Sequence, residues 1–242
     1  MNKTLLSIVV ATSLTLTGQA HAGAHVEVYA DFPITVKNYT GSKTHSEAYT
    51  GQIARHTLHN SVKKLVSKGA SLEQTKAYFN GKETGRVIVD PVSKDEFAVL
   101  QTHVDKISTG KNLSGKAYKG LISGMPGGLT GAELLDLMLE KAAATEKGFD
   151  PLTGYDYTQL ISKFTMGAVF YNQAVDNYLD EKLAADVNPN SKAYKEGKAY
   201  TGKEHIWDEA FGYFGAPAHT MKLTAAQVYG IAKQKADSFA KA

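Results

Sequence analysis

The chain of 242 residues contains no cysteine, only six prolines and a single tryptophan. The lack of cysteine excludes disulfide bonds, thiolate metal ligands, a cysteine nucleophile and a lipid-modified cysteine at a leader cleavage site. Any metal site must therefore use nitrogen and oxygen ligands, such as the side chains of His, Asp and Glu.

Long apolar runs are also lacking, except for one close to the N-terminus. Lys3 precedes an almost uncharged apolar run over residues 5–16, and Ala20-His21-Ala22 then supplies a cleavage site of the A-x-A type. The run is too short to cross a bilayer, which takes about 20 apolar residues. We therefore expect residues 1–22 to be a secretory signal peptide cleaved after Ala22, no membrane span, and a periplasmic or secreted protein.

Charge of one sign is not in large excess. Without the first 22 residues the chain has 26 basic and 24 acidic side chains, a net charge of +2. The lysines are scattered, and binding of nucleic acid needs a clustered basic stripe or a recognisable module. We therefore expect no nucleic-acid partner.

What the chain does have is a recurring signal for the start of a helix. Ser, Thr or Asp followed three residues later by Glu or Gln forms a capping box, and apolar residues at helical spacing follow each such pair. The pairs are Ser71 with Gln74, Ser93 with Glu96, Thr130 with Glu133, Asp156 with Gln159, and Thr224 with Gln227. The stripe after Ser93 includes Phe97, Leu100, Val104 and Ile107.

These signals predict an all-α fold. An earlier apolar stripe over residues 54–66 predicts a first helix that ends at Gly69, and the helix after Asp156 is expected to run to about Leu183. Residues 23–48 show only weak alternation followed by glycines and threonines. We expect an extended arm and loop over residues 23–48 and a helical bundle domain over residues 49–242.

Residues 204–215, with the sequence EHIWDEAFGYFG, hold the candidate site. At about 100° per residue, one helix face carries Trp207, Ala210, Phe211 and Phe214. The opposite face carries His205, Asp208, Glu209 and Gly212. We expect the aromatic face to pack and the polar face to bind, since His205 lies one turn from both acids. A solvated charged face is the alternative interpretation.

One helical turn supplies at most three ligands, so a metal site would need further donors from other helices. His56 and His59, three residues apart in the first helix, are candidates, as are Gln173 and Asp176 in the long helix. Surface exposure of the two histidines, which lie near lysines, is the alternative expectation.

Three segments resemble a known family of bacterial envelope proteins. They are YTGQIARHTLHNSVKKL (residues 49–65), SKFTMGAVFYNQAVDNYLDEKL (residues 162–183) and EHIWDEAFGYFGAP (residues 204–217). They resemble the family called domain of unknown function 4856, which is described as imelysin-like. The resemblance implies an imelysin-like helical bundle, a role in iron uptake at the envelope and envelope iron-uptake proteins as partners. It also implies that this chain is a C-terminally shortened member.

Three function classes remain at this point. The first, which we expect, is a non-enzymatic protein that binds iron or another divalent metal through His205, Asp208 and Glu209. The second is a metallopeptidase, although the chain has no H-E-x-x-H motif and His205 has no histidine four residues on. The third is a structural or protein-interaction module without metal, in which the aromatic residues of the motif are core anchors. The oligomeric state is left open.

Overall fold

The computed structural model describes residues 33–43, 46–90, 102–125, 127–184 and 188–215. This part of the chain is mainly α-helical, as the sequence predicts. The longer helices are α3 (Thr50–Ser67), α4 (Leu72–Phe79), α5 (Gly131–Ala143), α6 (Tyr157–Thr165), the π-helix η3 (Met166–Lys182) and α7 (Gly202–Gly215). Two 3-10 turns are η1 (Val104–Lys106) and η2 (Ser114–Lys116), and two short antiparallel strands are β1 (Phe149–Asp150) and β2 (Tyr155–Asp156).

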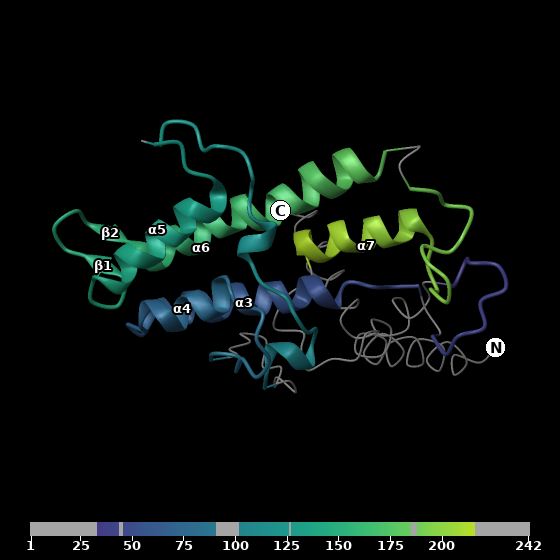
Figure 1. The fold of residues 1–242 in the computed structure, drawn as a ribbon, viewed down its shortest axis with the longest axis horizontal. Coiled ribbons are helices and arrows are strands. Elements are labelled where there is room, and N and C mark those ends of the chain that lie inside the picture. Colours follow the sequence, from purple (N-terminus) through teal and green to yellow (C-terminus); the bar gives the residue numbers. More distant parts are fainter. Residues whose placement is uncertain (1–32, 44–45, 91–101, 126, 185–187, 216–242) are drawn as a thin grey trace, which may run out of the picture.

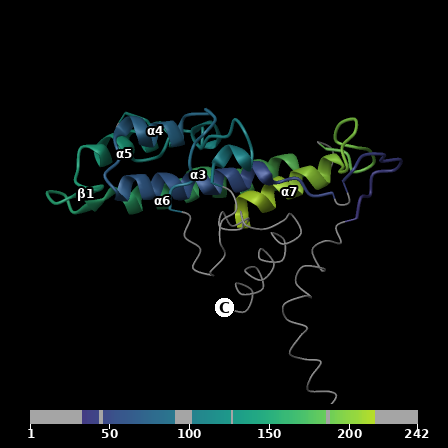
Figure 2. The same ribbon diagram turned by 90° about the horizontal axis from the view of Figure 1, so that it is seen from below.

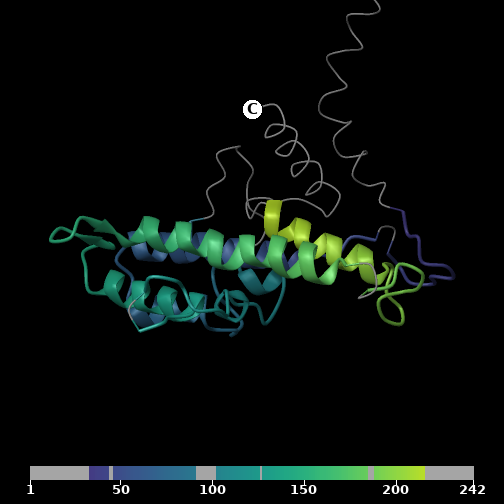
Figure 3. The same cartoon turned by 90° about the horizontal axis from the view of Figure 1, so that it is seen from above.

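Helix α6 continues directly into η3, so the two form one long rod (Figures 1 and 3). Helix α7 lies along the η3 half of this rod, while α5 packs against the α6 half. Helix α3 runs beside the rod and contacts α6, α4 and α7 (Figure 2). The α7 motif therefore packs against both η3 and α3.

The helix boundaries follow the local sequence signals. The Ser71 and Thr130 side chains each accept a hydrogen bond from the backbone of the third helical residue, and complete capping boxes are present at both sites. Asp156 caps α6 by accepting from the backbone N–H of Gln159. Gly69 follows the end of α3 with φ of 72°, a conformation that glycine adopts without steric cost. These expected boundaries are confirmed.

The start of α7 shows a capping pair that the sequence analysis did not identify. The backbone N–H of Thr201 donates to Glu204 Oε2 at 2.7 Å, and the backbone N–H of Glu204 donates to Thr201 Oγ1 at 3.2 Å. Thr35 Oγ1 also donates to Glu204 Oε1, at 2.6 Å. The N-terminal arm is thus joined to the first turn of α7 through Glu204.

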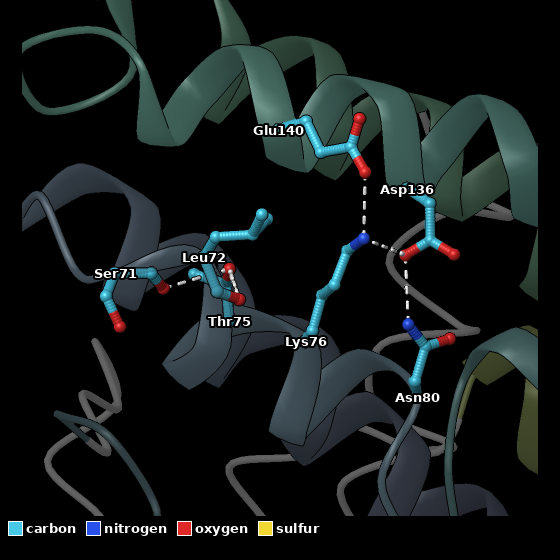
Figure 4. A network of polar contacts seen from close by, with 7 residues as sticks. All are labelled: Ser71, Leu72, Thr75, Lys76, Asn80, Asp136 and Glu140. Atoms are coloured by element: carbon cyan, nitrogen blue, oxygen red, sulfur yellow. Dashed lines mark hydrogen bonds and ion pairs between the residues drawn. The ribbon is translucent and has the colours of Figure 1, made fainter.

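A polar network joins α4 to α5 (Figure 4). Lys76 Nζ lies 2.9 Å from Glu140 Oε1 and 3.9 Å from Asp136 Oδ1, and Asn80 Nδ2 donates to Asp136 Oδ1 at 2.9 Å. Surface ion pairs of this kind contribute about 1 kcal/mol or less. The network therefore sets the register of the two helices more than it stabilises them.

The core lies between α3, α5 and the α6–η3 rod. It contains fully buried side chains from each of these elements, including Leu58, Leu135, Ile161 and Val169. Burial of one such side chain stabilises the fold by about 1.5–3 kcal/mol. No helix in the described ranges is long and apolar enough to span a membrane.

Some sequence expectations are corrected or lie outside the described residues. The helix predicted to start at Ser93 does not reach Val104 and Ile107, since Val104 begins a 3-10 turn of three residues. The long helix ends as expected but changes to π-helical hydrogen bonding at Met166, for which the residue pattern contains no signal. The signal peptide, the start of the helix at Ser93 and the helix after Thr224 fall outside the described ranges.

Candidate functional site

Helix α7 faces the rest of the protein with a different side from the one expected. Its buried hydrophobic residues are Ile206, Ala210 and Tyr213, whereas Trp207 is 55% exposed and Phe214 is 77% exposed. The expectation that the aromatic face packs is therefore wrong for these two residues. Helical periodicity separates two faces, but the partners on α3 and η3 decide which face turns inward.

The close approach of α7 to α3 depends on Gly212. A Cβ atom at this position would stand 2.8 Å from both Tyr49 Cβ and Gln52 Cβ. Nearby, His56 Nε2 lies 3.0 Å from the Gly212 carbonyl oxygen and 3.1 Å from that of Tyr213. The polar side of α7 is therefore a packing surface against α3.

His205 packs against two aromatic rings and has one ring nitrogen near an acid. Its Nε2 atom is 3.7 Å from Glu209 Oε2, and the ring centroids of Tyr194 and Tyr200 are 4.4 Å and 5.0 Å away. Its Nδ1 atom is buried and has no hydrogen-bond partner. Burial lowers the pKa of His205, while Glu209 raises it less, so the imidazole is neutral at pH 7. A neutral imidazole is the form that binds a metal ion.

The two acids of the motif point to different partners. Glu209 Oε1 accepts from Gln52 Nε2 at 3.0 Å, and Glu209 also shares a hydrogen bond with Tyr178. Asp208 Oδ2 accepts from the backbone N–H of Ala48 at 2.8 Å, just before α3 begins. Burial is the main reason that the pKa of Asp208 is raised to about 7.

The structure thus brings His205 and Glu209 together and directs Asp208 to Ala48 at the start of α3. In the ranges that the structure describes, no group of three or more His, Asp or Glu side chains lies close enough to hold a metal ion. His205 and Glu209 form a pair of candidate ligands, and within the described residues Asp208 on the same helix is a third candidate once its carboxylate leaves Ala48.

His56 and His59 are neither surface residues nor free ligands. His59 is 9% exposed and its Nε2 donates to the carbonyl oxygen of Ser162 on α6, at 3.0 Å. The His56 ring stacks on Phe170, with centroids 4.1 Å apart. Burial lowers the pKa of both histidines to about 4. The two expectations for this pair, a role as metal ligands and exposure at the surface, are therefore both corrected. The two rings instead connect α3 to α6 and α7 by hydrogen bonds to backbone carbonyl oxygens.

The remaining candidate donors on η3 are also engaged elsewhere. Gln173 Nε2 donates to the carbonyl oxygen of Lys116 at 3.0 Å. Asp176 lines a cavity of about 510 Å³ between one face of the α6–η3 rod and the segment that contains Tyr118 and Ile122. Neither side chain lies with the His205–Glu209 pair, so the expectation that Gln173 or Asp176 supplies a further metal ligand there is wrong.

Several residues around the pair had no signal in the sequence. Tyr178 on η3, Tyr213 on α7, Gln52 on α3 and the loop residues Tyr194 and Tyr200 come from separate segments. Tyr213 lies one helical turn after Glu209, and Tyr200 lies shortly before His205 in the chain, but Gln52 and Tyr178 are distant in sequence. Only the packing of α3, η3 and α7 brings these two residues to the pair.

The described architecture defines a mainly α-helical protein with a buried polar cluster between three helices. The family described as Domain of unknown function (DUF4856) matches residues 35–238. The chain belongs to this family, as its resemblance predicted. No curated protein and no solved structure matches the chain.

Proposed function

We propose that this protein is a secreted, non-enzymatic member of its family that binds iron or another divalent metal at the cell envelope. The observation that carries the proposal is the His205–Glu209 pair, with 3.7 Å between Nε2 and Oε2. A neutral imidazole and a carboxylate are suitable ligands for iron, manganese and zinc. The choice of iron and of envelope iron-uptake proteins as partners rests on the imelysin-like resemblance, and secretion rests on residues 1–22.

The pair offers two ligands, and a metal ion needs more. Asp208 is the adjacent donor, and its carboxyl group would exchange the Ala48 N–H for the metal. Because the pKa of Asp208 is about 7, metal binding through this group would release a proton near neutral pH. We therefore expect metal affinity to rise from pH 6 to pH 8.

A second candidate is a structural or interaction module without metal, and the contacts of the same side chains favour it. Asp208 bonds Ala48, and Glu209 bonds Gln52, so both acids already join α7 to α3. In that case the polar face of α7 serves packing alone.

Thermal melts of the mature protein, purified from the periplasm with Gly23 as its first residue, separate the two candidates. The melts would be run in EDTA and then with Fe(II), Fe(III), Zn(II) or Mn(II), for the parent and for His205→Ala. A metal at 100 times its dissociation constant stabilises the fold by about 2.7 kcal/mol, which raises the melting temperature by about 5–10 °C. His103→Ala is the control, because His103 precedes η1 and is remote in sequence from the motif.

A metal-specific rise that His205→Ala loses and His103→Ala keeps is the expected result. The same rise in parent and His205→Ala would overturn the assignment of the site. No rise with any metal would favour the module without metal. Recovery of the protein outside the envelope fraction with its first 22 residues intact would overturn secretion.

A further inference from the structure

Four cationic side chains lie in the part of the protein near Lys116 and Glu209. We call Arg55, Lys111, Lys116 and Lys182 the basic cluster; they come from α3, from the segment around η2 and from the end of η3. Burial lowers the pKa of Lys116, and the charges of Arg55, Lys182 and Lys111 lower it further, whereas Glu209 opposes this. Lys116 therefore lies within electrostatic range of the other three cations and of Glu209. Arg55 and Lys111 also lie near each other, since a Cβ atom on Gly51 would stand 3.6 Å from Arg55 Nη1 and 3.1 Å from Lys111 Cε.

Arg55 is the most deeply placed member. It is 8% exposed, and its Nε and Nη1 atoms donate to the carbonyl oxygens of Asn112 and Gly51, at 3.1 Å and 3.2 Å. Within the described part of the chain, no member of the basic cluster forms an ion pair with a carboxylate. A buried guanidinium usually has an anionic partner, because burying an unpaired charge costs free energy.

The ring of Tyr213, which carries a hydroxyl without an acceptor, lies next to Arg55. Tyr213 is 1% exposed, its hydroxyl has no hydrogen-bond partner, and Arg55 Cζ is 5.7 Å from its ring centroid. The neighbouring ring of Tyr178 lies under Lys182 Nζ, 4.0 Å from the centroid. A buried O–H donor with no acceptor, on a ring that lies next to Arg55, is an environment that an anionic oxygen would satisfy.

The start of α3 adds to the positive potential at this place. The first turn of this helix contains no acidic residue. Lys111 reaches over this turn, since a Cβ atom on Gly51 would stand 3.1 Å from Lys111 Cε. The positive end of a helix favours a nearby anion, and at this end Asp208 reaches only the N–H of Ala48, one residue before the N-cap.

We propose that the basic cluster and the Tyr213 hydroxyl bind a small oxyanion, a carboxylate or a phosphate group. Lys111, Lys116 and Lys182 are partly exposed and give access from solvent, while Arg55 and Tyr213 form the inner end of the site. The inference goes beyond the proposed metal binding and does not depend on it.

Isothermal titration of the mature protein, freed of metal by passage over a chelating resin, tests the proposal, with inorganic phosphate and citrate as probes and chloride at equal ionic strength as the control. We expect phosphate or citrate to bind and chloride to give no saturable heat, and the stronger probe identifies the source of the oxyanion. Lys116→Met and Lys182→Met should each weaken binding about tenfold or more, since each removes a hydrogen bond to a charged group. Lys163→Met, at the α6 end of the same rod, should bind like the parent.

Tyr213→Phe separates an anion site from a structural role. Loss of an unpaired buried hydroxyl should leave the melting temperature of the free protein unchanged or raise it, yet weaken the binding of the anion. His205→Ala removes a candidate metal ligand but no member of the anion site, so this variant should still bind the anion. The metal proposal and the anion proposal can therefore fail independently of each other. The absence of saturable binding by either probe would overturn the proposal, as would equal affinity in the parent, Lys116→Met and Lys182→Met.

Discussion

The two buried histidines predict how this protein responds to acid. His56 and His59 both have a pKa of about 4 in the folded state, against 6.5 for an ordinary histidine. Between pH 6.5 and pH 4 the unfolded chain therefore binds protons that the folded chain does not. Stability from these groups is fully present above pH 6.5 and is lost as the pH falls to 4.

The size of the effect follows from the same values. At pH 5 the unfolded histidine is almost fully protonated and the folded one is not, so each histidine lowers the free energy of unfolding by about 2 kcal/mol relative to pH 7.5. The two together lower it by about 4 kcal/mol, which is a large part of the total for a typical domain. Asp208, with a pKa of about 7, has the opposite dependence in this range and offsets part of the loss.

The double variant His56→Gln/His59→Gln isolates the histidines. Glutamine keeps an N–H donor for the backbone carbonyls but does not titrate, and Asp208 is common to both proteins. Urea unfolding followed by circular dichroism at pH 7.5, 6 and 5 would give the free energies. The parent should lose about 4 kcal/mol more than the double variant between pH 7.5 and pH 5. Equal losses would refute the view that both rings are held neutral by burial.

Two further predictions concern α7. Asp208→Asn keeps an acceptor for Ala48 but removes a carboxyl group whose pKa is raised to about 7. The free energy of unfolding of this variant should exceed that of the parent by up to about 4 kcal/mol at pH 8, and by less than about 1 kcal/mol at pH 4. Equal urea midpoints of the two proteins at pH 8 would contradict this. Gly212→Ala should destabilise by about 1–3 kcal/mol, because its Cβ would overlap Tyr49 and Gln52. Gly167→Ala is the matched control, since its Cβ meets nothing within 4 Å and alanine favours helix by up to about 1 kcal/mol. The same sign of change in both glycine variants would argue against the close packing of α7 on α3.

The sequence by itself determined the local features of this protein. The capping pairs at Ser71, Thr130 and Asp156 and the stop at Gly69 are read from neighbouring residues, because a cap is a contact over three or four positions of one chain. The all-α class and the family membership followed from the same short-range patterns.

The tertiary structure decided what those patterns could not. The spacing of residues in α7 defines two helix faces but does not say which one packs inward. Hydrogen bonds to Ala48 and Gln52, beside and on α3, direct Asp208 and Glu209 inward. Trp207 is left exposed. The separation of Asp208 from the His205–Glu209 pair and the gathering of Arg55 and Lys182 likewise depend on contacts between residues more than a hundred positions apart. Contacts at such separations depend on how whole helices pack, so they cannot be predicted from the spacing of residues along the chain.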